Sequence, residues 1–463
     1  MAYGKTIAAI STPSGKGGVA IIRISGDEAV EIASRVFLPK NKKSVQEIAT
    51  RVQTWGDILY NREYIDDGML TVFKAPASYT GEDVVEISCH GGILVTRTVL
   101  EAVLSAGASH AEPGEFTKRA FINGKLSLTE AEAVGDLLEA KSREQIRLTS
   151  SASRSRLSDA ISEIRCALTE LLSSTFARID YPDEDLGDFT DEESLEKLYK
   201  IKKSLLRLIS TYPTGKAISE GINTVLCGKT NVGKSTVYNA ILGEDAAIVT
   251  DIEGTTRDVL CRSIPLGRVM LNLSDTAGIR DSERADAVEK IGIDRTRAAI
   301  SGAELIISVF DGSRAADDED NALISLLAGI DCPKIALINK SDLDEKFDRT
   351  LLADRFVHVI SASAKSREGE LLEKLSAAVN SLFTDEKISV GNEAVISSAR
   401  HNASLSRALS FVDAAIAAYS SGVYTDAAAS EVERALGAIA EIDGRAVSEE
   451  VVSDIFSKFC VGK

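Results

Sequence analysis

The residues with the clearest chemical pattern are 228–236, which read GKTNVGKST. They match G-x-x-x-x-G-K-[ST], the pattern of a loop whose backbone N–H groups surround phosphates. We expect Lys234 to reach the β- and γ-phosphate oxygens and the Ser235 hydroxyl to ligate Mg²⁺. A strand-like run, NTVLC, precedes the loop and a helical pattern follows, which is the context that this chemistry requires. The predicted nucleotide contacts in this loop are Asn231, Val232, Gly233, Lys234, Ser235 and Thr236.

Three later motifs indicate which nucleotide is bound. The stretch DTAG follows MLNLS, so that Asp275 would hold the water shell of the metal and the N–H of Gly278 would meet the γ-phosphate. The stretch NKSD follows KIALI, and Asp342 can accept two hydrogen bonds from guanine, whereas adenine would leave this carboxylate unpaired. The stretch SAK follows FVHVI and completes a base-binding edge. In this order the motifs predict a GTPase, with contacts from Asp275, Thr276, Ala277, Gly278, Asn339, Lys340, Asp342, Ser363, Ala364 and Lys365.

One position departs from the pattern of Ras-type enzymes. Ile279 follows DTAG directly, where those enzymes carry the glutamine that orients the attacking water. Asn231 and the stretch TDIEGTTRD at 250–258 together resemble GTPases in which a potassium ion replaces an arginine finger. Such an ion would supply positive charge next to the bridging oxygen. The expected contacts of this stretch are Thr250, Asp251, Ile252, Glu253, Gly254, Thr255 and Thr256.

Within that set, oxygens of Asn231, Thr250, Ile252 and Thr255 are the expected K⁺ ligands, which leaves Thr256 for Mg²⁺ beside Ser235. Asn231 could instead be a side chain that caps the loop. Arg257 is a candidate transition-state cation, and a surface ion pair is the alternative for it.

The surrounding patterns predict a multidomain α/β plus all-α protein. Residues 1–120 mix strand-like runs such as GVAIIRISG and DVVEISCHGG with one helical stretch near LVTRTVLEAVLSAG, as in an α+β domain. Residues 121–217 are helical, and 218–383 alternate short apolar strands with helices, as in a parallel sheet of a P-loop GTPase. Ala-rich helices return over 384–463. We therefore expect a discontinuous helical domain, with the GTPase domain inserted in it.

Composition excludes several classes of protein. The 463 residues contain no run of 18 apolar residues that would span a bilayer, and the N-terminus lacks the apolar core of a signal peptide, so we expect a cytoplasmic protein without membrane contact. The six cysteines include no C-x-x-C pair, which argues against a disulfide framework or a zinc site. A net charge of −17 disfavours binding of nucleic acid by bulk electrostatics, so an RNA partner would need a local basic patch or a second protein.

The whole chain resembles the MnmE family of tRNA-modifying GTPases, also called TrmE. The resemblance rests on TIAAISTPSGKGGVAIIRISG from residue 6, on YTGEDVVEISCHGG, on PGEFTKRAFINGKLSLTEAEAV and on the terminal IFSKFCVGK. It implies an N-terminal domain that is similar to folate-dependent one-carbon transferases and mediates dimerisation, followed by the helical and GTPase parts described above.

The resemblance also implies a site for 5-formyl- or 5,10-methylene-tetrahydrofolate. Its residues here would be Arg23, Glu86 and Lys125, with the terminal Lys463 folding back toward them. Glu86 suits the donors of a pterin ring, and the cations suit carboxylate or carbonyl oxygens. Cys460 becomes the candidate reactive group, although it could equally pack beside Phe459 as a small apolar residue.

The function implied by the resemblance is GTP hydrolysis by a homodimer that regulates tRNA modification. With an FAD-containing partner, MnmG or GidA, the family adds an aminomethyl or carboxymethylaminomethyl group at carbon 5 of the wobble uridine. Glu289, in AVEKIGI, would act on the attacking water; by residue type alone it would be a solvated helix residue. Two alternatives stay open: a GTP-switched ribosome-assembly factor that binds rRNA, and an autonomous one-carbon transferase in which the GTPase domain only regulates.

Overall fold

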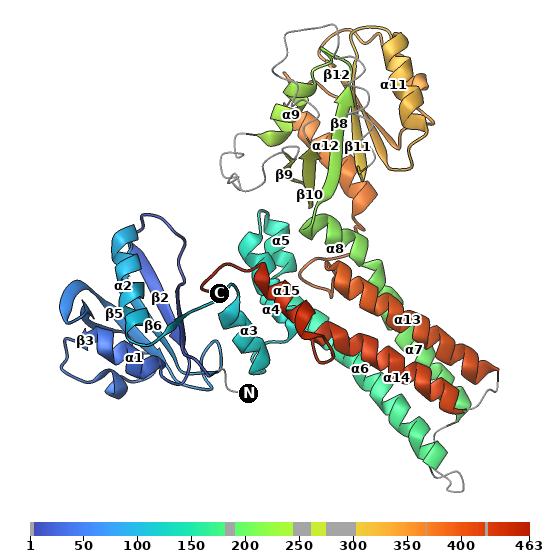
Figure 1. Ribbon diagram of the computed structural model, residues 1–463. Coiled ribbons are helices and arrows are strands. Elements are labelled where there is room, and N and C mark those ends of the chain that lie inside the picture. The colour runs from blue at the N-terminus through green and yellow to red at the C-terminus, as the bar shows by residue number, and fades with distance from the viewer. Residues whose placement is uncertain (1–3, 181–189, 244–260, 275–301, 367, 422–424) are drawn as a thin grey trace. The chain divides into compact units, whose positions relative to one another are not determined.

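The computed structural model describes residues 4–180, 190–243, 261–274, 302–366, 368–421 and 425–463 (Figure 1). Contacts divide the chain into two compact units, Met1–Leu138 with Gly437–Lys463, and Glu139–Leu436. The last 27 residues therefore pack with the first part of the chain, while the intervening sequence forms the second unit. None of the described helices is long and apolar enough to cross a membrane.

The first unit is built on a seven-stranded sheet in the order β3-β4-β5-β6-β2-β1-β7. Neighbouring strands are antiparallel except β1 and β7, which are parallel. The strands are β1 Ile7–Ile10, β2 Val19–Ser25, β3 Phe37–Pro39, β4 Thr54–Tyr60, β5 Glu63–Phe73, β6 Val84–His90 and β7 Ser109–His110.

Successive side chains of β2 point to opposite faces of the sheet, which separates its core residues from Arg23. Ala20, Ile22 and Ile24 are buried in the core beneath α1 (Ala29–Val36) and α2 (Ile93–Ser105), whereas Arg23 is on the opposite face of the sheet. In the β2–β6 register Arg23 is paired with Glu86. Strand pairing therefore brings together two residues that lie far apart in the sequence.

The predicted helix near 93–107 is present as α2, but α1 is an additional helix that the sequence pattern did not indicate. It has only eight residues and no side-chain cap at its N-terminus, so the usual start signal is missing. Burial of Ala29, Ile32, Ala33 and Val36 against the sheet stabilises it instead.

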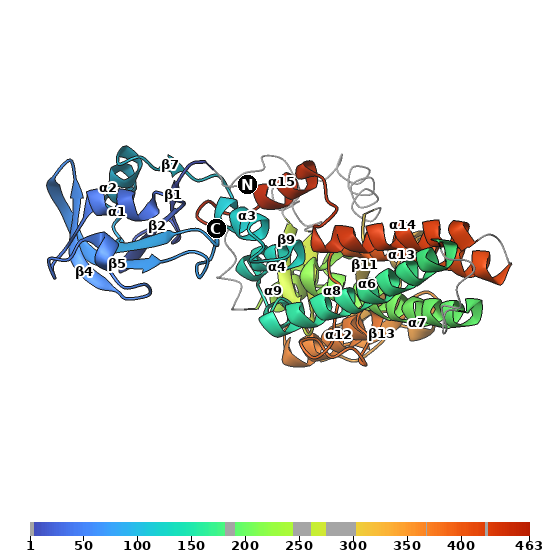
Figure 2. The same cartoon turned by 90° about the horizontal axis from the view of Figure 1, so that it is seen from below.

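A small helical cluster joins the two ends of the first unit. Leu128 and Ala131 of α4 (Leu128–Glu139) form an apolar core with Val452 and Phe456 of α15 (Glu449–Ser457). The helix α3 (Glu115–Ile122) lies beside the C-terminus in Figures 1 and 2.

The second unit contains a six-stranded sheet in the order β13-β12-β11-β8-β10-β9. It is parallel except for the β9–β10 pair. The strands are β8 Ile222–Gly228, β9 Cys261–Leu266, β10 Val269–Ser274, β11 Leu305–Asp311, β12 Lys334–Asn339 and β13 His358–Ser361, and the helices around them are α9 Lys234–Leu242, α11 Asp318–Ala328 and α12 Glu368–Phe383. Two apolar clusters contain residues of this sheet, as expected for a parallel sheet with both faces covered.

Long helices complete the second unit. The helices α6 (Ser151–Asp180), α7 (Asp191–Ser210) and α13 (Ala399–Ser420) run alongside the part of α14 (Thr425–Asp443) that belongs to this unit, up to Leu436 (Figures 1 and 2). Two short helices, α5 (Arg143–Leu148) and α8 (Tyr212–Ser219), lie in contact with each other, and α8 leads directly into β8. The mixture of an α+β part, an α/β part and long helices confirms the predicted fold class.

Candidate functional site

The phosphate-loop motif forms the turn between β8 and α9. Three of its residues have positive φ angles: Gly228 (149°), Asn231 (65°) and Gly233 (96°). A Cβ atom on Gly233 would lie 2.3 Å from Nδ2 of Asn339, which excludes a larger residue there without displacement of that side chain. The glycines thus permit the turn that follows the carboxyl end of β8, and α/β proteins bind ligands at this end of the sheet.

Lys234, the first residue of α9, points into the loop. Its Nζ atom donates hydrogen bonds to the carbonyl oxygens of Gly228 (2.7 Å) and Lys229 (2.6 Å). Burial lowers the pKa of this ammonium group. Ser235 and Thr236 are exposed in the first turn of the same helix, where N–H groups are available to an anion.

Asn339 connects the phosphate loop to the base-binding motifs. Its buried amide donates from Nδ2 to the Val232 carbonyl (2.9 Å), and its Oδ1 accepts from the backbone N–H of Ala364 (3.0 Å). NKSD, SAK and the phosphate loop therefore meet through one side chain. Sequence order alone did not predict this contact.

The remaining residues of the two base motifs surround this link. Lys340, at φ 65°, donates from Nζ to Oδ2 of Asp311 at the end of β11 (2.6 Å). Burial opposes ionisation of Asp311, but the hydrogen bonds from Lys340 and Ser313 outweigh it and lower the pKa of this carboxyl group. Asp342 and Lys365 are solvent-exposed, while Ser363 is buried and accepts from the N–H of Ser366 (3.2 Å).

A charged cluster supports the loop from the side of α11. Asp317 caps the N-terminus of α11 through the N–H groups of Glu319 and Asp320, and its Oδ2 atom lies 2.6 Å from Nζ of Lys229. The hydrogen bond from Lys229, with that from the Asp320 N–H, lowers the Asp317 pKa to about 2. Lys229 belongs to the phosphate-loop motif, so this pair ties the loop to the neighbouring helix.

Several predicted nucleotide and metal contacts lie outside the described residues. These are Thr250, Asp251, Ile252, Glu253, Gly254, Thr255, Thr256, Asp275, Thr276, Ala277, Gly278 and Glu289. Among the residues that the structure describes, no group of three or more His, Cys, Asp and Glu side chains is arranged to hold a metal ion.

A second cluster of predicted residues lies in the first unit. Nε and Nη2 of Arg23 both contact Oε1 of Glu86 at 2.9 Å, and Nη1 lies 3.5 Å from the carbonyl oxygen of Gly462. Each nitrogen of the guanidinium group therefore already has an acceptor. The pairing holds Arg23 and Glu86 as one unit on the sheet surface.

The C-terminal FCVGK segment packs against the start of α3. Val461 forms an antiparallel bridge with Pro113, and the N–H of Phe116 donates to the carbonyl of Lys463 (3.2 Å). Gly462 adopts φ 95°, and a Cβ atom there would lie 2.2 Å from the carbonyl oxygen of Ile10. Glycine at position 462 is thus required by a close backbone contact, while Cys460, two residues earlier, is exposed.

Lys125 belongs to the same region but makes a different contact. Its Nζ atom donates to the carbonyl of Pro76 (3.0 Å), in the loop that connects β5 to β6. The structure therefore brings Arg23, Glu86 and the C-terminal segment into direct contact and connects Lys125 to them through that loop. Tyr79 in this loop and Phe116 in α3 flank Arg23. The sequence pattern indicated neither as a site residue, although YTGEDVVEIS and PGEFTKRAF contain them.

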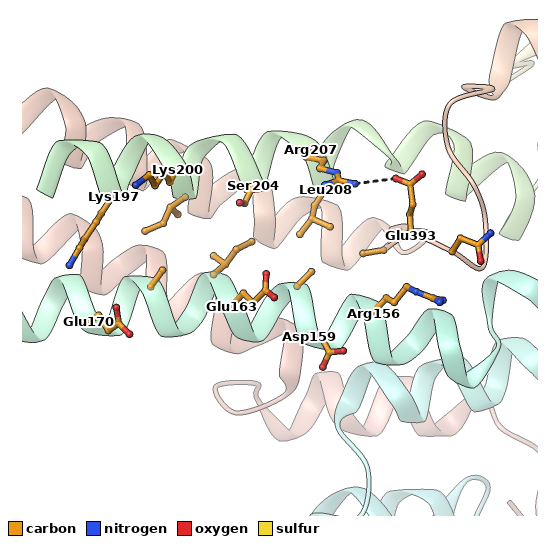
Figure 3. A pocket seen from close by; sticks show the side chains of 16 residues that line it. Arg156, Asp159, Glu163, Glu170, Lys197, Lys200, Ser204, Arg207, Leu208 and Glu393 are labelled. Atoms are coloured by element: carbon orange, nitrogen blue, oxygen red, sulfur yellow. Dashed lines mark hydrogen bonds and ion pairs between the residues drawn. The ribbon is translucent and has the colours of Figure 1, made fainter. Parts of the chain in front are cut away.

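A groove of about 570 Å³ lies elsewhere, between α6 and α7 of the second unit. In Figure 3 the labelled acidic residues Asp159, Glu163 and Glu170 belong to α6 and the basic residues Lys197, Lys200 and Arg207 to α7, with Arg207 hydrogen-bonded to Glu393. None of the predicted site residues lines it.

Family models and named relatives match nearly the whole chain. A family model described as the GTP-binding protein TrmE N-terminus matches residues 6–125, and one described as the MnmE helical domain matches residues 128–460. A relative from Acetivibrio thermocellus, named tRNA modification GTPase MnmE, is 41% identical over 99% of both chains. A relative of the same name from Clostridioides difficile is 38% identical over 99% of both. Among solved structures, Era from Aquifex aeolicus matches with 19% identity over 41% of this chain and 66% of that chain, at a TM-score of 0.26.

Proposed function

Since the chain belongs to the MnmE family of tRNA modification GTPases, we propose that it is a potassium-activated GTPase that works in wobble-uridine modification. With an FAD-dependent partner of the MnmG type, it would install an aminomethyl or carboxymethylaminomethyl group at carbon 5 of that uridine. The carbon atom would come from a tetrahydrofolate. The observation that carries the nucleotide part of this proposal is the Asn339 link between the phosphate loop and both base motifs.

The chain's own residues account for binding of GTP. Lys234 donates hydrogen bonds to two carbonyl oxygens of the phosphate loop, and burial lowers the pKa of its ammonium group. An anionic phosphate beside it would stabilise the charged form of this group. The exposed Asp342 carboxylate suits the two donors on guanine. Mg²⁺ would be held by Ser235 with Thr256, and would neutralise phosphate charge.

Potassium activation depends on Asn231. This residue is exposed and its backbone has a positive φ angle, so its amide oxygen is presented on the phosphate loop rather than packed under it. An amide oxygen is a suitable ligand for a hard cation. The other proposed K⁺ ligands are Thr250, Ile252 and Thr255, and Glu289 is the residue proposed to act on the attacking water.

The folate part of the proposal rests on the cluster in the first unit. A pterin ring has N–H donors that suit the Glu86 carboxylate, and both contacts of Arg23 with Glu86 fall on Oε1. The terminal Lys463 is brought to α3 by the docked C-terminal segment, and Lys125 lies on the adjacent loop. These cations suit the carbonyl or carboxylate oxygens of a folate. Cys460 is the proposed reactive group.

The proposed assembly is a homodimer that binds the MnmG-type partner and tRNA. The net charge of −17 supports a division of labour in which the partner supplies much of the phosphate contact.

The first test is steady-state GTP turnover by the full chain in KCl and in NaCl at equal ionic strength. We expect at least a tenfold higher rate in KCl, as for other groups that stabilise developing phosphate charge. Asn231→Ala should remove most of that difference, while Asn321→Ala, on the exposed face of α11, should leave it unchanged. Equal rates in both salts would show that another group supplies the charge.

A further inference from the structure

The guanidinium group of Arg23 lies between two aromatic rings. Its central carbon is 5.6 Å from the ring centroid of Tyr79 and 5.6 Å from that of Phe116. Phe116 is fully buried, whereas Tyr79 retains 36% of its surface in contact with solvent. The two rings differ in role, because only Tyr79 can still be approached by another molecule.

Tyr79 is also fixed in place. Its hydroxyl lies 2.9 Å from Oγ1 of the buried Thr117, and its loop is held by hydrogen bonds from Asn123 to the Thr80 carbonyl (2.8 Å) and from Lys125 to the Pro76 carbonyl. A ring that is already ordered loses little conformational entropy when a ligand packs on it. Tyr79 therefore combines exposure with rigidity.

Beneath the loop, a buried ion cluster secures this arrangement. Arg119 of α3 is 1% exposed and contacts Glu82 (3.1 Å) and Glu115 (2.7 Å). Glu82 also accepts a hydrogen bond from Ser25 of β2 (2.8 Å). The loop that carries Tyr79 is thus joined to the helix that carries Phe116 and Thr117, and to the strand that carries Arg23.

The chemistry of the exposed surface favours a flat ring over a carboxylate. All three nitrogens of Arg23 already contact oxygen atoms of this chain, so its capacity to bind a new anion is reduced. Next to the Arg23–Glu86 pair, the site presents the solvent-accessible part of the Tyr79 side chain. The planar pyrimidinone ring of a tetrahydropterin can pack on that ring while its N–H groups face a carboxylate.

We propose that Tyr79 is a specificity-determining residue of this site and forms a stacking contact with the pterin ring of the bound folate. The inference rests on the proposed function, because it requires that the site take a folate. Tyr79 selects the bicyclic end of the ligand, and the p-aminobenzoylglutamate end makes its contacts elsewhere.

Calorimetric titration of the full chain tests this inference with two probes, 5-formyltetrahydrofolate and p-aminobenzoylglutamate, which lacks the pterin. Tyr79→Leu should weaken binding of the folate about tenfold, and Tyr79→Phe, which keeps the ring, should weaken it no more than about threefold. Neither change should alter binding of p-aminobenzoylglutamate, measured directly or by competition. Tyr64→Leu, at a 62% exposed tyrosine of β5, is the matched control and should bind both probes normally.

Three other results of these titrations would contradict the proposal. Unchanged folate binding by Tyr79→Leu, equal losses for the Leu and Phe variants, or equal losses for both probes would overturn the stacking contact. If the unsubstituted chain binds no folate, the proposed one-carbon function fails as well, which the first titration shows on its own. The fluorescence of Trp55, which lies in the same unit as both substitutions, should keep its urea midpoint in all variants and confirms that this unit is folded. GTP turnover, which depends on the second unit, should also be unchanged.

Discussion

Nη1 of Arg23 lies 3.5 Å from the carbonyl oxygen of Gly462, so a side chain near the beginning of the sequence meets the backbone next to its end. The same carbonyl accepts a hydrogen bond from the Ser11 hydroxyl (3.1 Å). The C-terminal segment is therefore part of the Arg23 site and not a solvated tail.

Gly462→Ala should detach this segment. A Cβ atom would lie 2.2 Å from the Ile10 carbonyl and the residue would have to keep φ 95°, both of which oppose docking. We expect at least a tenfold loss of 5-formyltetrahydrofolate affinity by calorimetry, with GTP turnover unchanged. Gly437→Ala, in a helix with no atom within 4 Å of the added Cβ, is the control and should behave like the parent chain. Normal folate binding by Gly462→Ala would contradict the role of the segment.

Asn339→Asp should weaken nucleotide binding without a change in side-chain size. The new carboxylate would face the Val232 carbonyl oxygen, to which the amide now donates a hydrogen bond. Replacing a buried donor with a charged acceptor lowers the binding free energy by about 1–3 kcal/mol. This corresponds to roughly a 5- to 150-fold loss of affinity for a fluorescent GDP analogue. The same substitution at the exposed Asn321 should have no effect. Retained affinity in Asn339→Asp would mean that the link between the motifs is dispensable.

Asp317 should contribute to stability in a pH-dependent way. Its pKa in the folded chain is about 2, below the ordinary value of 3.8, so its stabilising effect is complete above the ordinary value and is lost as pH falls toward 2. Asp317→Asn keeps a good helix cap but removes the charge that pairs with Lys229. The urea concentration at the midpoint of unfolding, measured by circular dichroism, should therefore decrease less steeply with falling pH in this variant than in the parent chain.

Asp318→Asn provides the comparison for that experiment. It removes one negative charge from the first turn of the same helix, but Asp318 is not part of the Lys229 pair. Its acid dependence should resemble that of the parent chain. If both variants show the same slope, the helix charge rather than the Lys229 contact is responsible.

Arg119→Met should destabilise the first unit selectively. The substitution leaves Glu82 and Glu115 partly buried without their cation, and removal of one partner from such a cluster costs about 3–5 kcal/mol. Trp55, the single tryptophan of the chain, lies in this unit, so its fluorescence during urea unfolding reports the loss. Lys118→Met, at a neighbouring residue that is not part of the cluster, is the control. A midpoint shared by Arg119→Met and the parent chain would contradict the stabilising role of the cluster.

The sequence by itself determined the GTPase motifs and the order of the elements. A phosphate loop depends on local backbone shape, so GKTNVGKST between a strand and a helix was sufficient to predict the turn at 228–236. Helices longer than about 12 residues were also evident, because their apolar periodicity extends over several turns. The short helix α1 was missed because burial against the sheet, and not a local start signal, stabilises it.

Only the tertiary structure decided which distant residues form one site. Arg23 and Glu86 became candidates through resemblance, but their contact depends on the β2–β6 register, which no local pattern specifies. The same is true of the Asn339 link and of Tyr79, a loop residue whose importance comes from its contact with Arg23 on β2. Local sequence encodes turns and helices because their hydrogen bonds are short-range, whereas contacts between distant segments depend on how the whole chain packs.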